Sequence, residues 1–115
     1  MKKILLVDDE QSFLQNLDMA LSKYFEIYAA TGVREAIDIL KQNVIDLICS
    51  DLYMRDGTGV DLLQEVKKNH RNIPFILLSG SEYNWDIKMA EHYGAIFIPK
   101  GEFDLIKQIV TIADL

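Results

Sequence analysis

The chain has 115 residues, of which half are hydrophobic and 26% are charged, as expected for one compact domain with a packed core. No apolar run approaches the roughly eighteen residues of a membrane span. The net charge of −6 argues against non-specific binding to nucleic acid or to an anionic membrane. The apolar run near the N-terminus is too short for a signal peptide and is followed by two aspartates, so we expect a cytoplasmic protein. The lone cysteine, Cys49, excludes an internal disulfide, and its apolar neighbours predict a core position.

Short apolar runs alternate with amphipathic stretches along the chain. The runs predict strands at residues 3–7, 26–29, 45–50, 75–79 and 95–99. Helical spacing of apolar residues predicts helices at 11–23, 60–69, 85–93 and 102–113, the last with Phe103 on its buried stripe. A further helix, with Thr31 as its N-cap, is predicted from the buried stripe of Val33, Ala36, Ile37 and Leu40. This alternation predicts a single α/β domain, residues 1–115, built on a doubly wound parallel sheet.

Chemically active side chains follow four of the predicted strands. Asp8 and Asp9 follow the first, Asp51 ends the third, Ser79 ends the fourth and Lys100 follows the fifth. In a parallel sheet these strand ends lie along one edge, where ligands of such folds bind. Each residue alone is better explained as a cap, a turn or a surface charge, but their combination at every relevant strand end favours a shared site. Clustered carboxylates with a lysine and a hydroxyl fit Mg²⁺-assisted phosphoryl transfer, with one carboxylate as nucleophile.

With these residues at the strand ends, the sequence resembles the receiver domain of bacterial two-component response regulators. The segments "ILLVDDE", "DLYMRDGTG", "ILLSG" and "FIPK" are similar to four sequence motifs of that family, at closely matching intervals. The resemblance covers essentially the whole chain, and it implies a flavodoxin-like five-stranded sheet of order 2-1-3-4-5.

The resemblance also implies roles for individual residues. Asp51 would be the phosphoacceptor, and Asp9, Asp51 and the backbone carbonyl of Tyr53 would ligate Mg²⁺, with Asp8 holding a metal-bound water. Lys100 would neutralise charge on the transferred group. Ser79 and the aromatic Phe97 would then switch the surface formed by the fourth helix, fifth strand and fifth helix. Tyr53 and Ser81 would flank the path of the hydrolytic water.

A domain of this family is a regulatory phosphoacceptor rather than a metabolic enzyme, although it catalyses its own phosphorylation and dephosphorylation. The resemblance implies a histidine kinase or histidine phosphotransfer protein as phosphodonor, and a protein target or fused output domain downstream. It implies no direct contact with nucleic acid or membrane, and it leaves open a homodimer that forms on phosphorylation.

The sequence departs from the family pattern around two of the motifs. Arg55 stands where the family usually has proline, and Gly101 follows Lys100 where the family usually has proline after a cis peptide bond. The interval leading to Lys100 is also one residue shorter than usual. The Lys100–Gly101 bond is therefore either trans, with a locally altered loop, or strained into the cis form.

Other classes of protein remain as alternatives. A receiver-like module that is not phosphorylated would explain Arg55 and Gly101. A flavin or nucleotide binder is disfavoured because Gly57 and Gly59 follow the third strand rather than the first and no third glycine completes a dinucleotide motif. A phosphatase with an aspartyl nucleophile would need a second acid where Tyr53 stands.

Overall fold

A parallel sheet forms the centre of the molecule. The computed structural model describes residues 1–69, 72–80 and 84–115, with the backbone alone at 84–86, and in these residues five parallel strands pair in the order β2-β1-β3-β6-β7. The strands are β1 (Lys3–Val7), β2 (Glu26–Ala30), β3 (Leu47–Asp51), β6 (Phe75–Ser79) and β7 (Ile96–Pro99). The predicted order 2-1-3-4-5 is confirmed, since β4 and β5 belong to a separate hairpin.

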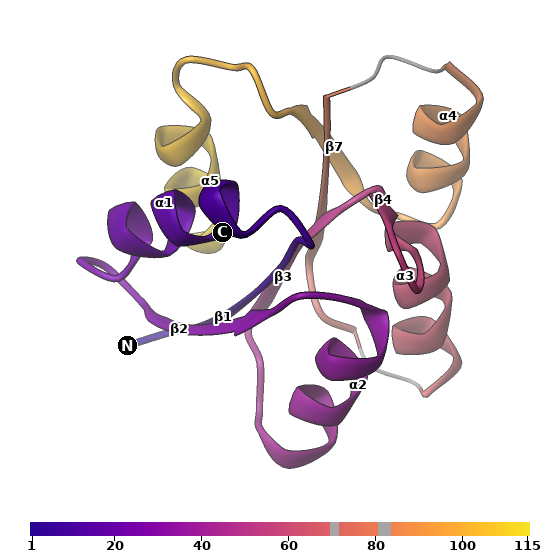
Figure 1. The fold of residues 1–115 in the computed structure, drawn as a ribbon, viewed down its shortest axis with the longest axis horizontal. Helices are drawn as coiled ribbons and strands as arrows, with labels where there is room; N and C mark the ends of the chain where they lie inside the picture. The colour runs from indigo at the N-terminus through magenta and orange to yellow at the C-terminus, as the bar shows by residue number, and fades with distance from the viewer. Residues whose placement is uncertain (70–71, 81–83) are drawn as a thin grey trace.

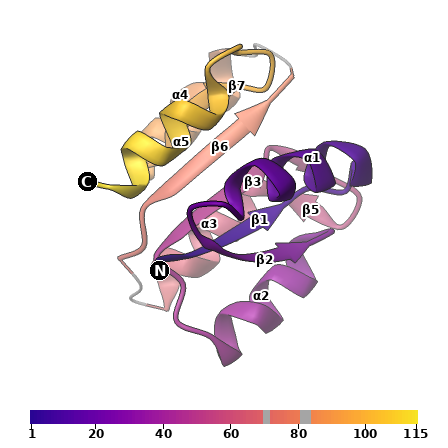
Figure 2. The same ribbon diagram turned by 90° about the vertical axis from the view of Figure 1, so that its left-hand side faces the viewer.

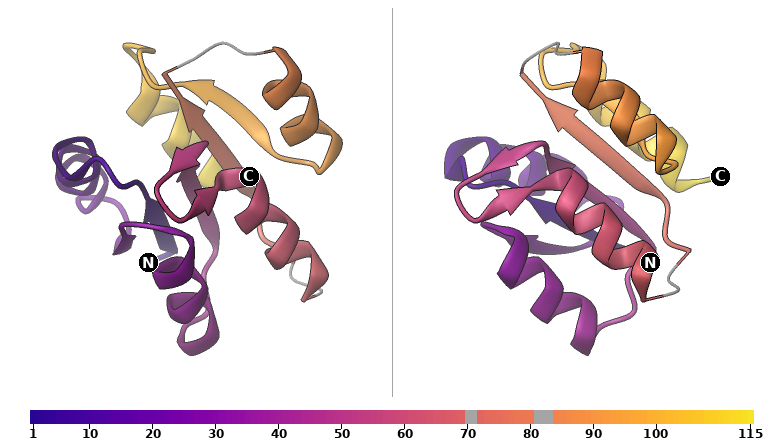
Figure 3. Two further views of the ribbon diagram at one scale, coloured as in Figure 1. Left: turned by 45° about the vertical axis from the view of Figure 1, so that its right-hand side comes forward. Right: turned by 90° about the vertical axis from the view of Figure 1, so that its right-hand side faces the viewer.

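Helices cover both faces of this sheet, as a doubly wound fold requires. Helices α1 (Gln11–Leu21) and α5 (Leu105–Ala113) lie on one face, and α2 (Val33–Gln42), α3 (Gly59–Lys68) and α4 (Asn84–His92) lie on the other (Figure 1). Figure 3 shows the second group from its own side, in front of the sheet. Two separate hydrophobic clusters result, one under each helical layer.

The central strands are buried on both faces, and their sequences are apolar along most of their length, up to the polar residues at their carboxyl ends. Every residue of β3 and of β6 is buried. Leu77 and Ile48 turn to the α2–α3 layer, whereas Ile76 and Cys49 turn to the α1–α5 layer. Burying each of the larger side chains stabilises the fold by roughly 1.5–3 kcal/mol, so these strands hold the sheet edge that carries the acidic residues.

The segment after β3 contains a hairpin that the sequence did not predict. Its strands β4 (Tyr53–Met54) and β5 (Gly57–Thr58) are antiparallel, joined by Arg55 and Asp56. The hairpin leads directly into α3, whose N-cap Thr58 accepts a hydrogen bond from the Asp61 N–H while Asp61 accepts one from the Thr58 N–H. This reciprocal capping fixes where α3 begins.

Two local predictions are wrong. Thr31 is not the N-cap of α2: the cap position is Gly32, and the Thr31 hydroxyl instead donates to Glu35. Phe103 is fully exposed, because residues before Leu105 form turns and α5 begins only there, which leaves Phe103 ahead of the first helical turn. The other predicted elements agree with the structure within about two residues at each end.

All five strands of the main sheet run in one direction, so their carboxyl ends share one edge. Figure 2 shows both chain termini near the opposite edge, where the strands begin. Within the described part of the chain, no helix is both long and apolar enough to cross a bilayer.

Candidate functional site

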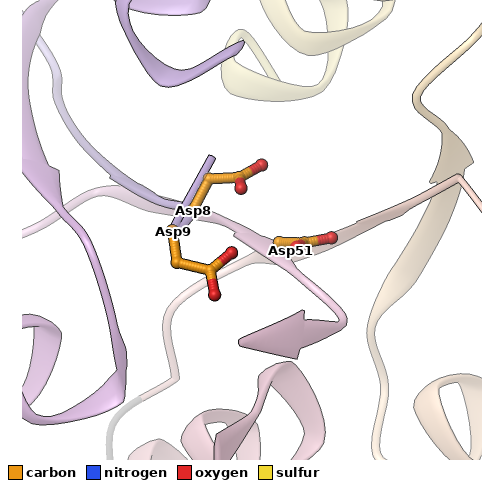
Figure 4. A group of neighbouring side chains, drawn as sticks. All are labelled: Asp8, Asp9 and Asp51. Atoms are coloured by element: carbon orange, nitrogen blue, oxygen red, sulfur yellow. The ribbon is translucent and has the colours of Figure 1, made fainter. Parts of the chain in front are cut away.

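Three carboxylates meet at the carboxyl edge of the sheet. Asp8 and Asp9 follow β1, and Asp51 is the last residue of the neighbouring β3. Each offers an oxygen that lies within 4.8 Å of an oxygen of the other two. Asp8 and Asp51 are buried, with 3% and 9% of their surface exposed. Figure 4 shows the three side chains next to one another on the two adjoining segments.

The backbone fixes the orientation of Asp8. Its N–H donates to the Ala30 carbonyl of β2, at 3.0 Å. One oxygen of its carboxylate, Oδ1, accepts a hydrogen bond from the Glu10 N–H at 2.9 Å. The side chain is therefore held in place as part of the turn between β1 and α1.

Asp51 is held in an unfavourable environment for a charged group. Burial, followed by repulsion from Asp8, raises the pKa of its carboxyl to about 6 from the ordinary value of 3.8. Attraction to Lys100 and a hydrogen bond from the Leu52 N–H to Oδ1, at 2.9 Å, act in the opposite direction. Because burial is the largest cause, the net rise shows chiefly that the Asp51 carboxylate is poorly solvated, with the charge of Asp8 as the second cause.

The backbone passes very close to Asp51 on one side. A Cβ on Gly59 would lie 2.5 Å from the Asp51 carbonyl oxygen and 2.4 Å from Leu77 Cδ2. Only glycine fits at position 59. The close contact of the two backbone segments lets the Gly59 N–H donate to the Leu52 carbonyl at 2.8 Å.

Lys100 brings a positive charge to the carboxylates from the end of β7. Its Nζ lies 2.7 Å from Asp8 Oδ2, 3.3 Å from Asp51 Oδ1 and 3.8 Å from Glu10 Oε2. Burial alone would lower the pKa of Lys100, but the two aspartates outweigh that effect and raise it. The ammonium group therefore stays charged within the site.

Two further contacts set the position of Lys100. Its backbone N–H donates to the Ser79 carbonyl at 3.0 Å, and its Nζ lies 4.5 Å from the centre of the Phe13 ring, within range of a cation–π interaction. None of the peptide bonds among the described residues is cis, so the Lys100–Gly101 bond is trans. Although the sequence interval leading to Lys100 is one residue shorter than usual in the family, the Lys100 ammonium still reaches Asp8 and Asp51.

The remaining predicted residues lie around this cluster at different depths. Ser79 is buried at the end of β6, where it pairs with Pro99 of β7. Phe97 is partly buried on β7 and packs against the cluster under α2 and α3. Tyr53 begins β4 with its side chain half exposed. Ser81 lies outside the described residues.

Sequence reasoning missed several contacts of the site. It gave no role at the site to Phe13 or Glu10, which both contact Lys100. It also missed the backbone N–H of Arg55, which donates to Asp9 Oδ2 at 3.0 Å. The absence of proline at position 55 was the one available signal, since proline has no N–H to donate.

The residues present fit a hard divalent cation. Mg²⁺ prefers one or two carboxylates together with carbonyl, water and phosphoryl oxygens. The close approach of the three carboxylate oxygens concentrates negative charge that such an ion would compensate. Asp8, Asp9 and Asp51 are the residues that could hold such an ion.

Comparison with proteins of known sequence gives the same family as the motifs. The model of the response regulator receiver domain family matches residues 4–110. The response regulator SaeR of Staphylococcus aureus is 31% identical over 120 residues, which cover all of this chain and 50% of SaeR. A probable cyclic di-GMP phosphodiesterase of Vibrio cholerae is 32% identical over 95 residues, 81% of this chain and 22% of that protein. The chain thus spans half or less of the length of these curated relatives.

Solved structures share the fold along its whole length. The receiver domain of HemR from Leptospira biflexa, in its non-phosphorylated form, superposes with a TM-score of 0.92 and 26% identity, covering 100% of this chain and 96% of that one. A response regulator receiver domain protein from Clostridium thermocellum gives a TM-score of 0.89 and 29% identity, covering 99% and 95%. The motifs, the strand order and these comparisons agree, and the chain belongs to the response regulator receiver domain family.

Proposed function

We propose that this domain accepts a phosphoryl group on Asp51 from a phosphohistidine of a histidine kinase or histidine phosphotransfer protein. The observation that carries the proposal is the pairing of the buried Asp51 with Lys100 at 3.3 Å, beside Asp8 and Asp9. A nucleophilic carboxylate, an ammonium and acidic metal ligands are the groups that such a transfer needs, and here they come from three separate strands.

The transfer exchanges one bond to phosphorus for another. An oxygen of Asp51 bonds to phosphorus as the bond to the donor breaks, and the donor leaves as a histidine imidazole or, from acetyl phosphate, as acetate. Mg²⁺, held by Asp9, Asp51 and the Tyr53 carbonyl with Asp8 orienting a water, would neutralise charge on the phosphoryl oxygens. Lys100, already held at Asp51, stabilises the same charge from the other side.

The signal would be a change in the balance of two conformations. A phosphoryl oxygen on Asp51 attracts the Ser79 hydroxyl at the end of the adjoining β6, and movement there lets Phe97 turn further inward. Phe97 is suited to this role because it is only partly buried. The surface that changes is α4, β7 and α5, which would face a downstream partner or a second copy of the domain.

Residues 1–115 would form a regulatory domain that acts in the cytoplasm and makes no direct contact with nucleic acid or membrane. Its output would pass through a protein target or a fused output domain. Relatives named as response regulators support this proposal, since the chain matches only part of their length.

The deciding experiment is intact-mass measurement after incubation with Mg²⁺ and acetyl phosphate. We expect one phosphoryl adduct on the unaltered chain and none on Asp51→Asn. A Lys100→Ala variant should form the adduct at least about a hundredfold more slowly, as expected for the loss of one group that stabilises transition-state charge.

The absence of an adduct on a folded, Mg²⁺-saturated chain would overturn the proposal, provided that a fluoroberyllate complex, which mimics the phosphorylated aspartate, also fails to form. It would favour the non-phosphorylated interaction module instead. An absorbance scan for bound flavin and a phosphatase assay test the other two alternatives on the same preparation.

A further inference from the structure

The β4–β5 hairpin contacts the acidic cluster through its own backbone. The Arg55 N–H donates to Asp9 Oδ2 at 3.0 Å, across 46 positions of sequence. We infer that this N–H is a positioning group for Asp9, which holds the carboxylate in the orientation that Mg²⁺ binding requires. The inference concerns the backbone of residue 55 and assigns no role to the arginine side chain.

The hairpin can hold Asp9 because the hairpin is itself anchored from the other direction. Asp56, next to Arg55, accepts hydrogen bonds from the first two N–H groups of α2: Val33 N–H to Oδ1 at 2.9 Å and Arg34 N–H to Oδ2 at 3.1 Å. These two bonds lower the pKa of Asp56, so its carboxylate stays charged and bound. The turn formed by Arg55 and Asp56 is thus hydrogen-bonded both to Asp9 and to the start of α2.

The sequence around this turn leaves it little freedom. A Cβ on Gly32 would lie 2.6 Å from Asp56 Oδ1, so the carboxylate fits against α2 only because residue 32 is glycine. On the other strand, Gly57 has φ +152, a backbone conformation open to glycine, and the next residue is the N-cap of α3. The position of the Arg55 N–H is therefore set by two helix N-termini.

A carboxylate with one oxygen held by a fixed donor presents its other oxygen in a defined direction. Such outer partners of metal ligands raise metal affinity by orienting the ligand before the ion arrives, and their loss typically weakens binding by 10–100-fold. Proline, the usual residue here in the family that the motifs resemble, has no N–H to donate. The substitution Arg55→Pro is therefore a specific deletion of one hydrogen bond.

The inference rests on the metal site of the proposed function, and its test keeps the two separable. Mg²⁺ affinity is measured by calorimetric titration, without any phosphodonor, for the unaltered chain, Arg55→Pro and Arg55→Ala. The alanine variant is the reference because it loses the same side chain and keeps the N–H. We expect Arg55→Pro to bind Mg²⁺ about tenfold more weakly than Arg55→Ala.

A second measurement does not depend on the proline variant folding. In the metal-free, unaltered chain the Arg55 amide hydrogen should exchange with solvent slowly, and Asp9→Ala should accelerate its exchange more than that of Val33. Affinities of the proline and alanine variants within twofold of each other, or an Arg55 amide that exchanges as fast in the unaltered chain as in Asp9→Ala, would overturn the inference. Failure of the unaltered chain to bind Mg²⁺ would instead overturn the metal site of the proposed function.

Discussion

At the scale of single residues, the charge of Asp51 opposes folding while the site holds no metal ion. Its carboxyl is buried and lies beside Asp8, and attraction to Lys100 offsets only part of the combined effect of burial and repulsion. The folded protein therefore favours the neutral carboxyl, which is why the pKa of Asp51 is raised to about 6. The ionised form of this proposed phosphoacceptor thus lowers the stability of the domain at neutral pH.

The raised pKa gives a pH-dependent prediction for Asp51→Asn. A carboxyl with a higher pKa in the folded state contributes stability that is complete below about pH 4 and is lost as pH rises through about 6. Asparagine does not titrate, so the variant should gain unfolding free energy over the unaltered chain as pH increases across this window. Urea unfolding without Mg²⁺ at pH 4 and pH 7 tests this, with the exposed Asp38→Asn on α2 as control for the loss of one charge. An equal difference at both pH values would contradict the prediction.

The tight approach at Gly59 gives a prediction about packing. In Gly59→Ala the new methyl group would meet the Asp51 carbonyl and Leu77, neither of which can move without disturbing β3 or β6. We expect a loss of about 1–3 kcal/mol in unfolding free energy. Gly101→Ala is the matched control, because nothing lies within 4 Å of its Cβ, and it should be neutral or stabilising by less than about 1 kcal/mol. Similar losses in both variants would show that the approach at Gly59 does not limit side-chain size.

At the scale of elements, the start of α2 depends on a residue from another part of the chain. Asp56 takes the place of a local N-cap, so Asp56→Ala should lower the unfolding free energy by about 1 kcal/mol. The amide hydrogens of Val33 and Arg34 should then exchange faster. Thr31→Ala is the control: its hydroxyl caps no backbone N–H of α2, so the exchange at these amides should not change. Faster exchange in Thr31→Ala but not in Asp56→Ala would restore Thr31 as the cap.

The elements differ in how well the sequence predicts them. The strands and their order were predictable because runs such as Phe75–Leu78 are apolar throughout and the motifs fix the family. The grouping of Asp8, Asp51 and Lys100 was also predictable, since a parallel sheet brings their strand ends together.

The errors arise where side-chain type and helical periodicity do not determine the backbone contacts. Thr31 has the right chemistry for a cap, yet Asp56 arrives from 23 residues away and occupies that place. Phe103 fits the helical period of α5, but periodicity does not determine where the first turn closes. The bond from the Arg55 N–H to Asp9 involves no side chain of Arg55, so its only sign in the sequence is that residue 55 is not proline.

At the scale of the whole molecule, cation binding should stabilise the fold because the unfolded chain has no assembled acidic cluster. Mg²⁺ at ten times its dissociation constant should add about 1.4 kcal/mol to the unfolding free energy. Thermal unfolding with and without Mg²⁺ measures this, and Asp9→Asn should remove most of the shift. An equal shift in Asp9→Asn would mean that the ion acts elsewhere on the protein.

The buried position of Cys49 makes the protein its own reporter of unfolding. The chain has one thiol, it lies in the middle of β3 with 1% of its surface exposed, and burial raises its pKa, so the reactive thiolate is scarce in the folded state. A maleimide or disulfide reagent should therefore label only molecules that have opened the central sheet. The rate at which the Cys49 thiol is labelled would report how each variant or ligand described above changes the opening of the sheet. The measurement needs no added dye or tag and would work in dilute solution or in a cell extract.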